Sequence, residues 1–241
     1  VAHSFPTRRS SDLSSTHLDL SAEILIKIRS VKFNDMSKIT IIDYGMGNIG
    51  SIQNMLKKIG ADSIVTSYTG EIKNSLKLIL PGVGSFDTGI KNLIKLDLVD
   101  ILNHKVINEK TPIIGFCLGM QLMTRSSEEG KLRGFGWMDA KTCRFRFNNS
   151  DEYKIPHMGW NSIKIMKDNP LLMEQSDRTR FYFVHSYHVI CKQSKDILFM
   201  TNYGYDFVSG FMKNNIVGLQ FHPEKSHKYG MQILKNFVWN I

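Results

Sequence analysis

The stretch that decides the fold is Gly115-Phe116-Cys117-Leu118-Gly119-Met120-Gln121, which follows the apolar run Thr111-Pro112-Ile113-Ile114. A glycine two residues before and two residues after a nucleophile is typical of a sharp turn between a strand and a helix. The nucleophile sits there at a strained backbone angle, and the glycines remove side chains that would collide with the returning chain. The positive end of the following helix favours the thiolate. We therefore predict that Cys117 is an activated nucleophile rather than an inert buried cysteine.

A base and a group that orients it come much later in the chain, in His222-Pro223-Glu224. The preceding segment, residues 217–222, alternates like a strand, and side chains two apart in an extended segment point the same way. We expect Glu224 to accept one ring N–H of His222, which leaves the other nitrogen to take the thiol proton. Taken alone, His-x-Glu is a weak pattern that more often lies on a surface. Together with the cysteine turn it predicts a triad.

The run Leu78-Ile79-Leu80-Pro81-Gly82-Val83-Gly84-Ser85-Phe86 is a buried type of strand that ends in a glycine-rich loop. Attack on a carboxamide creates an oxyanion, and one backbone N–H aimed at it typically contributes roughly 2.7–4 kcal/mol. We expect amides of this loop, at Val83 and Gly84, to form an oxyanion hole with the amide of Leu118. A tight turn without a ligand is the alternative for this loop.

Together with further segments, these motifs resemble the class I (triad-type) glutamine amidotransferases. The segments, in order, are Asp43-Tyr44-Gly45-Met46-Gly47-Asn48, Pro81-Gly82-Val83-Gly84, Ile155-Pro156-His157-Met158-Gly159-Trp160-Asn161, Tyr182-Phe183-Val184-His185-Ser186-Tyr187 and Gln220-Phe221-His222-Pro223-Glu224-Lys225-Ser226. Within that family the series looks like the glutaminase subunits of imidazole glycerol phosphate synthases, which act in histidine biosynthesis. The resemblance runs from about Lys38 to the C-terminus.

The resemblance implies that Cys117, His222 and Glu224 hydrolyse glutamine to glutamate and ammonia. It implies a heterodimer in which the ammonia passes through a tunnel into a partner (β/α)8 barrel, the cyclase subunit. By resemblance, residues that contact the glutamine are Gly82, Gln121, Ser186 and Tyr187. Residues that face the partner are, also by resemblance, Asn48, Pro156, Met158 and Trp160.

One segment departs from the histidine-pathway pattern, which usually has Gly-Leu-Gly followed closely by Pro-Gly. This chain has Gly134-Phe135-Gly136-Trp137-Met138-Asp139-Ala140 instead. With His227-Lys228-Tyr229-Gly230-Met231-Gln232 after the triad, the segment looks like a paralogous branch associated with cell-surface sugar amidation. The alternative function is therefore a glutaminase that supplies ammonia to a sugar amidotransferase.

Three other functions fit parts of the sequence. Gly45-Met46-Gly47-Asn48-Ile49-Gly50 satisfies the dinucleotide pattern G-x-G-x-x-G, but Ser67-Tyr68-Thr69 occupies the place of the acidic residue that would confirm it. A PfpI-like protein without glutaminase activity would share the cysteine turn, yet Gln121 and the His-Pro-Glu element fit it poorly. An intact triad argues against a non-catalytic scaffold. Other histidines that could be proposed as the base are His157, His185, His188 and His227.

Composition excludes several classes of function. The 241 residues suffice for one substantial core, and no run approaches the ~20 apolar residues of a membrane span. The net charge of +9 comes from scattered lysines, so we expect no nucleic-acid partner. Three cysteines without metal-ligand spacing indicate a reducing cytoplasm, and we expect neither a metal nor a cofactor.

Residues 1–35 lie outside the resemblance and are polar and rich in turn formers. We expect a non-native or disordered extension there, with Met36 as the true start and residues 36–241 as one amidotransferase domain.

Alternating strands and helices in the first half predict an α/β fold, a doubly wound (flavodoxin-like), mostly parallel sheet with catalytic groups at the carboxyl ends of its strands. Expected helices cover residues 49–59, 98–108 and 229–240. Expected strands cover residues 38–43, 63–66, 77–80, 113–116, 142–147, 162–166, 181–190, 198–202, 207–212 and 216–221.

Overall fold

The structure is a computed structural model that describes residue 1 and residues 39–147, 152–174 and 179–241. Residue contacts group Ser37–Ile241 into one compact unit. The expectations for the N-terminal extension fall on residues that lie almost wholly outside the described ranges, so the boundary at Met36 stays a prediction.

Parallel strands form the centre of the main sheet, as the sequence predicts. Their spatial order is β2 (Ser63–Thr66), β1 (Ile39–Ile42), β3 (Lys77–Leu80), β4 (Ile113–Phe116) and β12 (Ile216–Leu219). With β12 counted as the fifth strand, this is the 2-1-3-4-5 order of a doubly wound, flavodoxin-like sheet. The order makes β3, β4 and β12 neighbours, so the segments that leave their carboxyl ends meet at one edge.

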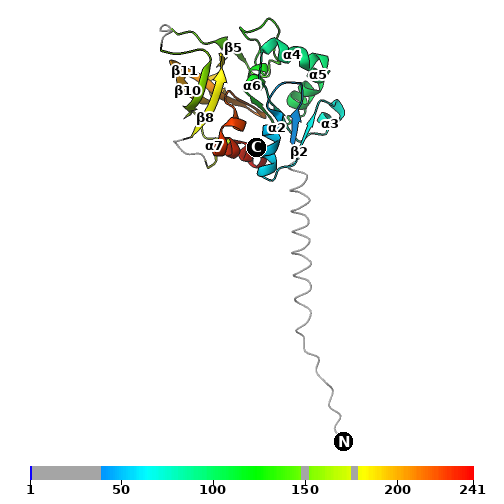
Figure 1. The fold of residues 1–241 in the computed structure, drawn as a ribbon. Coiled ribbons are helices and arrows are strands. Elements are labelled where there is room, and N and C mark those ends of the chain that lie inside the picture. The colour runs from blue at the N-terminus through cyan, green and yellow to red at the C-terminus, as the bar shows by residue number, and fades with distance from the viewer. Residues whose placement is uncertain (2–38, 148–151, 175–178) are drawn as a thin grey trace. The chain divides into compact units, whose positions relative to one another are not determined.

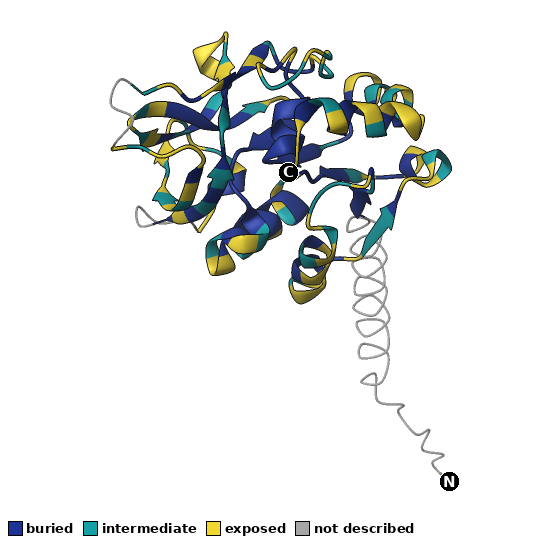
Figure 2. Cartoon of the chain, turned by 45° about the horizontal axis from the view of Figure 1, so that its top comes forward, coloured by how far each residue is buried: buried dark blue, intermediate teal, exposed yellow. Residues whose placement is uncertain are grey.

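Helices cover both faces of this sheet (Figure 1). One face packs against α2 (Ile49–Lys58) and α7 (His227–Asn240). The other face packs against α3 (Thr69–Lys73), α4 (Phe86–Lys95), α5 (Leu98–Asn103) and α6 (Leu118–Leu122). Successive strand residues divide between the two cores because side chains alternate along a strand; Ile41 belongs to the first core and Ile42 to the second. Figure 2 shows the strands as buried and the helices as exposed on their outer sides.

Beyond β12 the sheet continues with antiparallel strands. These are β11 (Tyr205–Lys213), β10 (Ile197–Tyr203), β7 (Lys164–Ile165), β9 (Tyr187–Cys191) and β5 (Ala140–Arg144). A second, two-stranded sheet pairs β6 (His157–Ser162) with β8 (Arg180–His185). Short helical turns are η1 (His104–Asn108, a π-helix), η2 (Pro170–Leu172), η3 (Ser194–Asp196) and η4 (Pro223–Lys225). Within the described ranges, no helix has the length and apolarity that a membrane crossing requires.

The structure corrects several expected elements. The strand expected over residues 181–190 is two strands, because the chain turns at Ser186 and passes from the β6–β8 sheet into the main sheet. The strand expected over residues 162–166 is the end of β6 and the short β7. Helices α3 and α4 were not expected. Gly89 in α4 packs closely on α6, since a Cβ there would lie 3.2 Å from the Leu122 methyl carbons. Phe86, Ile90 and Leu93 of α4 are buried at helical spacing, so the sequence carries an amphipathic signal for this helix that the prediction missed.

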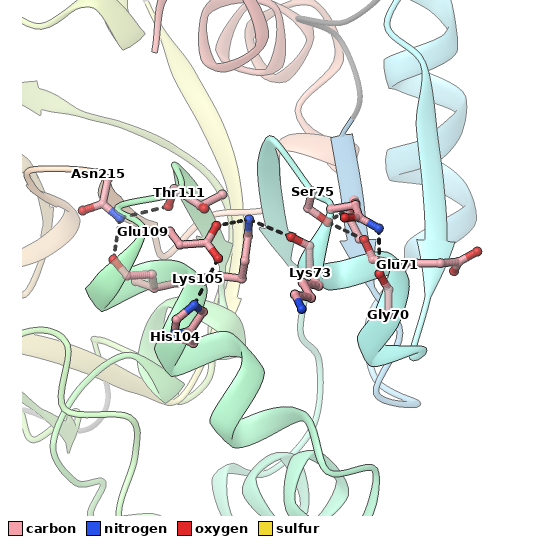
Figure 3. Close-up of polar contacts among 12 residues, drawn as sticks. Gly70, Glu71, Lys73, Ser75, His104, Lys105, Glu109, Thr111 and Asn215 are labelled. Atoms are coloured by element: carbon pink, nitrogen blue, oxygen red, sulfur yellow. Dashed lines mark hydrogen bonds and ion pairs between the residues drawn. The ribbon is translucent and has the colours of Figure 1, made fainter.

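A polar cluster supports the opposite, amino-terminal edge of the sheet (Figure 3). The buried Lys105, in η1, donates to the carbonyl of Lys73 at 3.1 Å and pairs with Glu109 at 2.5 Å. The side chain of Asn215 donates to the carbonyls of Val106 and Thr111, each at 2.9 Å. Asn215 therefore ties the π-helix and the entry to β4 to the turn before β12.

Replacing Asn215 by alanine should lower the free energy of unfolding by about 2 kcal/mol, because two partly buried carbonyls lose their donor. Urea unfolding measures this loss. Asn74→Ala is the control, since that side chain makes one exposed bond, to the Gly70 carbonyl at 3.1 Å. Equal losses in the two variants would contradict the prediction.

Candidate active site

Cys117 stands at the turn between β4 and α6 with φ 49° and ψ −106°, a conformation that L-residues rarely adopt. A Cβ on Gly115 would lie 2.7 Å from the backbone of Gly119, and a Cβ on Gly119 would lie 1.9 Å from the carbonyl oxygen of Leu80. Both glycines are therefore required by close backbone approach. The N–H of Cys117 donates to the carbonyl of Leu219 at 2.8 Å, which ties the turn to the end of β12.

His222 and Glu224 form a buried pair. His222 Nδ1 lies 2.8 Å from Glu224 Oε1, and each side chain is only 2% exposed. The local reason differs from the expected one, because β12 ends at Leu219 and Glu224 lies in the 3-10 turn η4 rather than in an extended strand. The backbone of His222 is held separately, since its N–H donates to the Tyr182 carbonyl at 2.9 Å. Among the described residues, His222 Nε2 has no hydrogen-bond partner, which leaves it available for proton transfer.

The electrostatics of this pair favour a charged imidazole. Burial by itself lowers the pKa of His222, but the adjacent Cys117 and then Glu224 outweigh it and raise the pKa to about 10. Raised above the ordinary value near 6.5, this group adds stability that is fully present below about pH 6.5. That contribution is lost as the pH rises through about 10.

Replacing Cys117 by alanine should lower the pKa of His222, because the largest of the influences that raise it is removed. Nitrogen NMR of the imidazole rings, recorded as a function of pH, measures the change. His188 is the internal control, since its pKa is lowered, first of all by burial, and neither Cys117 nor His222 is among the groups that act on it. Identical His222 titrations in the two proteins would show that the sulfur does not act on this ring.

A cleft of about 520 Å³ opens over the cysteine turn. Its lining residues are Val83, Gly84, Cys117, Leu118, Gln121, Glu129, Pro156, Val184, His185, Ser186, Tyr187, His222 and Lys225. Eight of the predicted catalytic, oxyanion and substrate residues, His222 included, thus line one cleft, although they come from segments far apart in sequence. Glu224 lies behind His222. Glu129 was not predicted as a site residue, because its position after α6 carries no local motif.

The oxyanion loop is folded onto the cysteine turn. A Cβ on Gly82 would lie 2.7 Å from the amide nitrogen of Gly119, so only glycine permits this approach. Gly84 has φ +112°. The N–H of Leu118 points to the carbonyl of Gly82 at 3.4 Å, while Tyr44 Oη donates to the carbonyl of Pro81 at 2.6 Å. In this arrangement a carbonyl oxygen, rather than an oxyanion, faces the Leu118 amide.

Both amide hydrogens of Gln121 are used inside the protein. Its Nε2 lies 3.2 Å from the Tyr187 carbonyl and 3.2 Å from Gln220 Oε1. Gln220 Nε2 in turn lies 3.6 Å from Cys117 Sγ. Gln121 can therefore offer a substrate only its carbonyl oxygen. Gln220 was not predicted as a site residue, although it stands two positions before His222.

The four predicted interface residues are exposed. Met158 and Trp160 are 61% and 42% exposed, and both point outward from β6 because its side chains alternate. The Trp160 ring stacks on His227 at a centroid distance of 5.6 Å. Asn48, before α2, and Pro156, on the rim of the cleft, are also exposed.

A family model described as "Glutamine amidotransferase class-I" matches residues 40–241. The chain belongs to the class I glutamine amidotransferase family. Its curated relatives include proteins named imidazole glycerol phosphate synthase subunit HisH 2 from Methanococcus maripaludis (56% identical over 200 residues) and from Pseudomonas aeruginosa (47% identical over 200 residues). Each alignment covers 83% of this chain and 98% of the relative. A Leptospira borgpetersenii relative named HisH is 42% identical over 201 residues.

Solved structures show the same fold. A crystal structure described as a glutamine amidotransferase matches with a TM-score of 0.60 at 15% identity, covering 82% of this chain and 96% of that protein. A glutamine amidotransferase from Thermotoga maritima matches with a TM-score of 0.57 at 18% identity, covering 78% of this chain and 76% of that protein. The predicted α/β fold is therefore confirmed both by topology and by likeness to other proteins.

For a class I glutamine amidotransferase, the G-x-G-x-x-G segment has a packing explanation. A Cβ on Gly47, at φ +116°, would lie 2.8 Å from the Cβ of Pro81, so this glycine lets the loop after β1 reach the oxyanion loop. The segment that departs from the histidine-pathway pattern also has a packing role. Trp137 is buried, stacks on Phe135 and donates from Nε1 to Asn103 Oδ1 at 2.8 Å. This segment therefore packs beside α5.

Proposed function

We propose that this chain is the glutaminase subunit of an imidazole glycerol phosphate synthase. It hydrolyses glutamine and passes the ammonia to a cyclase subunit in histidine biosynthesis. The observation that carries the proposal is the meeting of a strained cysteine turn with a buried His222–Glu224 pair in one cleft. The names of the relatives, which are 42–56% identical over most of the chain, support the choice of enzyme.

The reaction follows from the geometry. The Cys117 thiolate attacks the carboxamide carbon of glutamine, and the carbonyl oxygen becomes an oxyanion. His222 Nε2 gives its proton to the leaving nitrogen, so the C–N bond breaks, ammonia departs and a glutamyl thioester remains. His222 then takes a proton from water, which attacks the thioester, releases glutamate and restores the thiolate. Glu224 holds Nδ1–H throughout and stabilises the imidazolium.

Oxyanion stabilisation requires a change in the loop. The Gly82 carbonyl occupies the Leu118 N–H at 3.4 Å, so the loop at Gly82, Val83 and Gly84 must turn an amide inward before both donors point at the oxyanion. We propose that this turn is coupled to ligand binding by the partner. Glutamine hydrolysis would then stay slow until the cyclase holds its substrate.

The cleft offers groups that suit free glutamine. The carboxylate of Glu129 accepts from the Phe86 N–H at 2.8 Å and lines the cleft, where a carboxylate matches the α-ammonium group. Ser186 lies between β8 and β9, Tyr187 begins β9, and both line the same cleft. Gly82, Gln121, Ser186 and Tyr187 are the proposed glutamine contacts.

The proposed partner is a (β/α)8 cyclase barrel, bound as a heterodimer in the cytoplasm. The surface of this chain that would contact it consists of four exposed residues: Asn48 before α2, Pro156 on the rim of the cleft, and Met158 and Trp160 on β6. An apolar rim at this place would keep ammonia away from water and so prevent its protonation.

Replacing Trp160 by alanine should weaken partner binding by about tenfold or more, because buried tryptophans often dominate interface energetics. Isothermal titration of the variant with the barrel measures the affinity. Ile190→Ala on β9 is the matched control, since Ile190 is 43% exposed against 42% for Trp160. Unchanged affinity, with full coupling of glutamine use to product, would rule out this surface.

The proposed function is tested by mixing the chain with a histidine-pathway cyclase barrel and its nucleotide substrate and measuring glutamate and imidazole glycerol phosphate. We expect ligand-dependent glutamate release with matched product formation. Activity that appears only with a paralogous barrel and a sugar amidotransferase would assign the ammonia to sugar amidation instead.

A further inference from the structure

An unbroken line of hydrogen bonds joins strand β6 to the nucleophile. On the β6 side, Asn161 Nδ2 lies 3.3 Å from His157 Nε2, and His157 Nδ1 lies 3.0 Å from His185 Nε2. In the middle, the Tyr187 carbonyl lies 2.7 Å from His185 Nδ1 and 3.2 Å from Gln121 Nε2. On the cysteine side, Gln121 Nε2 lies 3.2 Å from Gln220 Oε1, and Gln220 Nε2 lies 3.6 Å from Cys117 Sγ. We call these residues the relay.

The direction of each hydrogen bond among the histidines of the relay follows from which atoms can donate a hydrogen. The Tyr187 carbonyl can only accept, so His185 carries its hydrogen on Nδ1 and accepts at Nε2. His157 must then donate from Nδ1 and accept at Nε2 from the Asn161 amide. Asn161 is fixed as well, since its Nδ2 donates to the Asn202 carbonyl at 2.8 Å. Because a backbone carbonyl separates the histidines from the glutamines, the relay cannot pass a proton from end to end and can only position groups.

The histidines and glutamines of the relay are buried and uncharged. His157, His185, Gln121 and Gln220 are each at most 6% exposed. Burial lowers the pKa of His157 to about 4 and holds that of His185 well below its usual value. The titratable groups that act on His185 are His157, His188 and His222. Neutral histidines with fixed hydrogens keep each neighbour in one orientation.

Gln220 completes the relay at the reacting atom. It is fully buried, its Oε1 accepts from Gln121, and one of its amide hydrogens points to the sulfur. A thiolate is a stronger acceptor than a thiol, so this N–H stabilises the charged form. Without Gln121 to hold the amide, the side chain could present its oxygen to the sulfur instead.

We propose that Gln220 is a further catalytic residue, which donates its side-chain N–H to the Cys117 thiolate, and that His157 and His185 are positioning residues that hold it through the Tyr187 carbonyl and Gln121. The relay starts on β6, whose inward residues are His157 and Asn161 and whose outward residues are Met158 and Trp160. A partner seated on the outward face therefore contacts the strand that anchors the relay. This inference deepens the proposed glutaminase function and rests on it.

The test is the pH dependence of Cys117 alkylation by iodoacetamide in the full chain, followed by peptide mass spectrometry. Iodoacetamide reports on the thiolate whether or not glutamine is the substrate, so a failure of the relay and a failure of the proposed function remain distinguishable. The variants are Gln220→Met, which keeps the length of the side chain without a donor, and His185→Phe. His188→Phe is the matched control, because His188 is equally buried in the same aromatic cluster but bonds to Tyr205 Oη at 3.0 Å, outside the relay.

We expect Gln220→Met to shift the alkylation midpoint upward by about one pH unit or more and to lower kcat about tenfold with little change in KM. His185→Phe should shift the midpoint in the same direction by less, and His188→Phe should match the wild type. A wild-type midpoint in Gln220→Met, or equal shifts in the two histidine variants, would overturn the proposal. If circular dichroism shows that His185→Phe does not fold, the alkylation midpoint of Gln220→Met alone decides whether the proposal holds.

Discussion

Replacing Cys117 by alanine is expected to lower glutamine hydrolysis by about 10⁴–10⁶-fold while the fold remains intact. The sulfur is the atom that the proposed mechanism acylates; His222, which Glu224 holds from behind, and Gln220 are its neighbours. Without it, the remaining donors can bind glutamine but cannot form the thioester. Glutamate release in the presence of the cyclase barrel and its nucleotide measures the loss.

Cys143→Ala is the matched control for this prediction. Cys143 is also buried, at 5% exposure against 7% for Cys117, but it lies on β5. Its pKa is raised, chiefly by burial, so the thiol stays neutral. Removing it should leave the activity within about twofold. Comparable activity in the two alanine variants would mean that the nucleophile has been misidentified.

Replacing Gly119 by alanine is expected to lower the free energy of unfolding by about 3 kcal/mol or more. The added Cβ would lie 1.9 Å from the carbonyl oxygen of Leu80 and 2.9 Å from its carbonyl carbon. Both are backbone atoms of a buried strand, so neither can rotate away, and β3 must separate from the cysteine turn. Because the oxyanion loop leaves β3 directly after Leu80, activity should fall with stability.

Urea unfolding measures the stability of the Gly119→Ala variant, with Gly50→Ala as the matched control. Gly50 lies in the first turn of α2, and no heavy atom of the described part of the chain lies within 4 Å of a Cβ added there. The same substitution there should be neutral or stabilise by up to about 1 kcal/mol, since alanine favours helices. A Gly119→Ala protein as stable as the wild type would contradict the packing of the cysteine turn.

The parallel half of the fold follows from local sequence signals. Residues 78–80 and 113–116 are short apolar runs next to turn formers, and the structure has β3 and β4 at the predicted bounds of 77–80 and 113–116. The triad could be paired from sequence because both halves lie in compact motifs. The local backbone structure of the triad could not be predicted. The turn that brings Glu224 back to His222 is a 3-10 helix, which the alternating pattern of residues 217–222 does not reveal.

The strand-rich half was harder to predict because its pairing partners are distant in sequence. β6 contains Gly159 and follows Pro156, which weakens its local strand signal, yet it pairs with β8 more than twenty residues later through His157 and His185. The break at Ser186 interrupts a segment from Phe181 to Ile190 that is rich in aromatic and β-branched strand formers. Gln220 was missed for a related reason: its role depends on Gln121 and Cys117, which approach it only in the folded chain.

The most direct test of the central claim is covalent labelling with a glutamine analogue that carries a diazoketone in place of the carboxamide. The chain is labelled together with the cyclase barrel and its nucleotide, and the modified peptide is identified by mass spectrometry. Cys143 and Cys191 are internal controls, because burial, first of all, raises the pKa of both thiols, to about 12 for Cys191. We expect labelling at Cys117 that glutamine prevents. Labelling spread over the three cysteines, or unaffected by glutamine, would contradict a glutaminase site at Cys117.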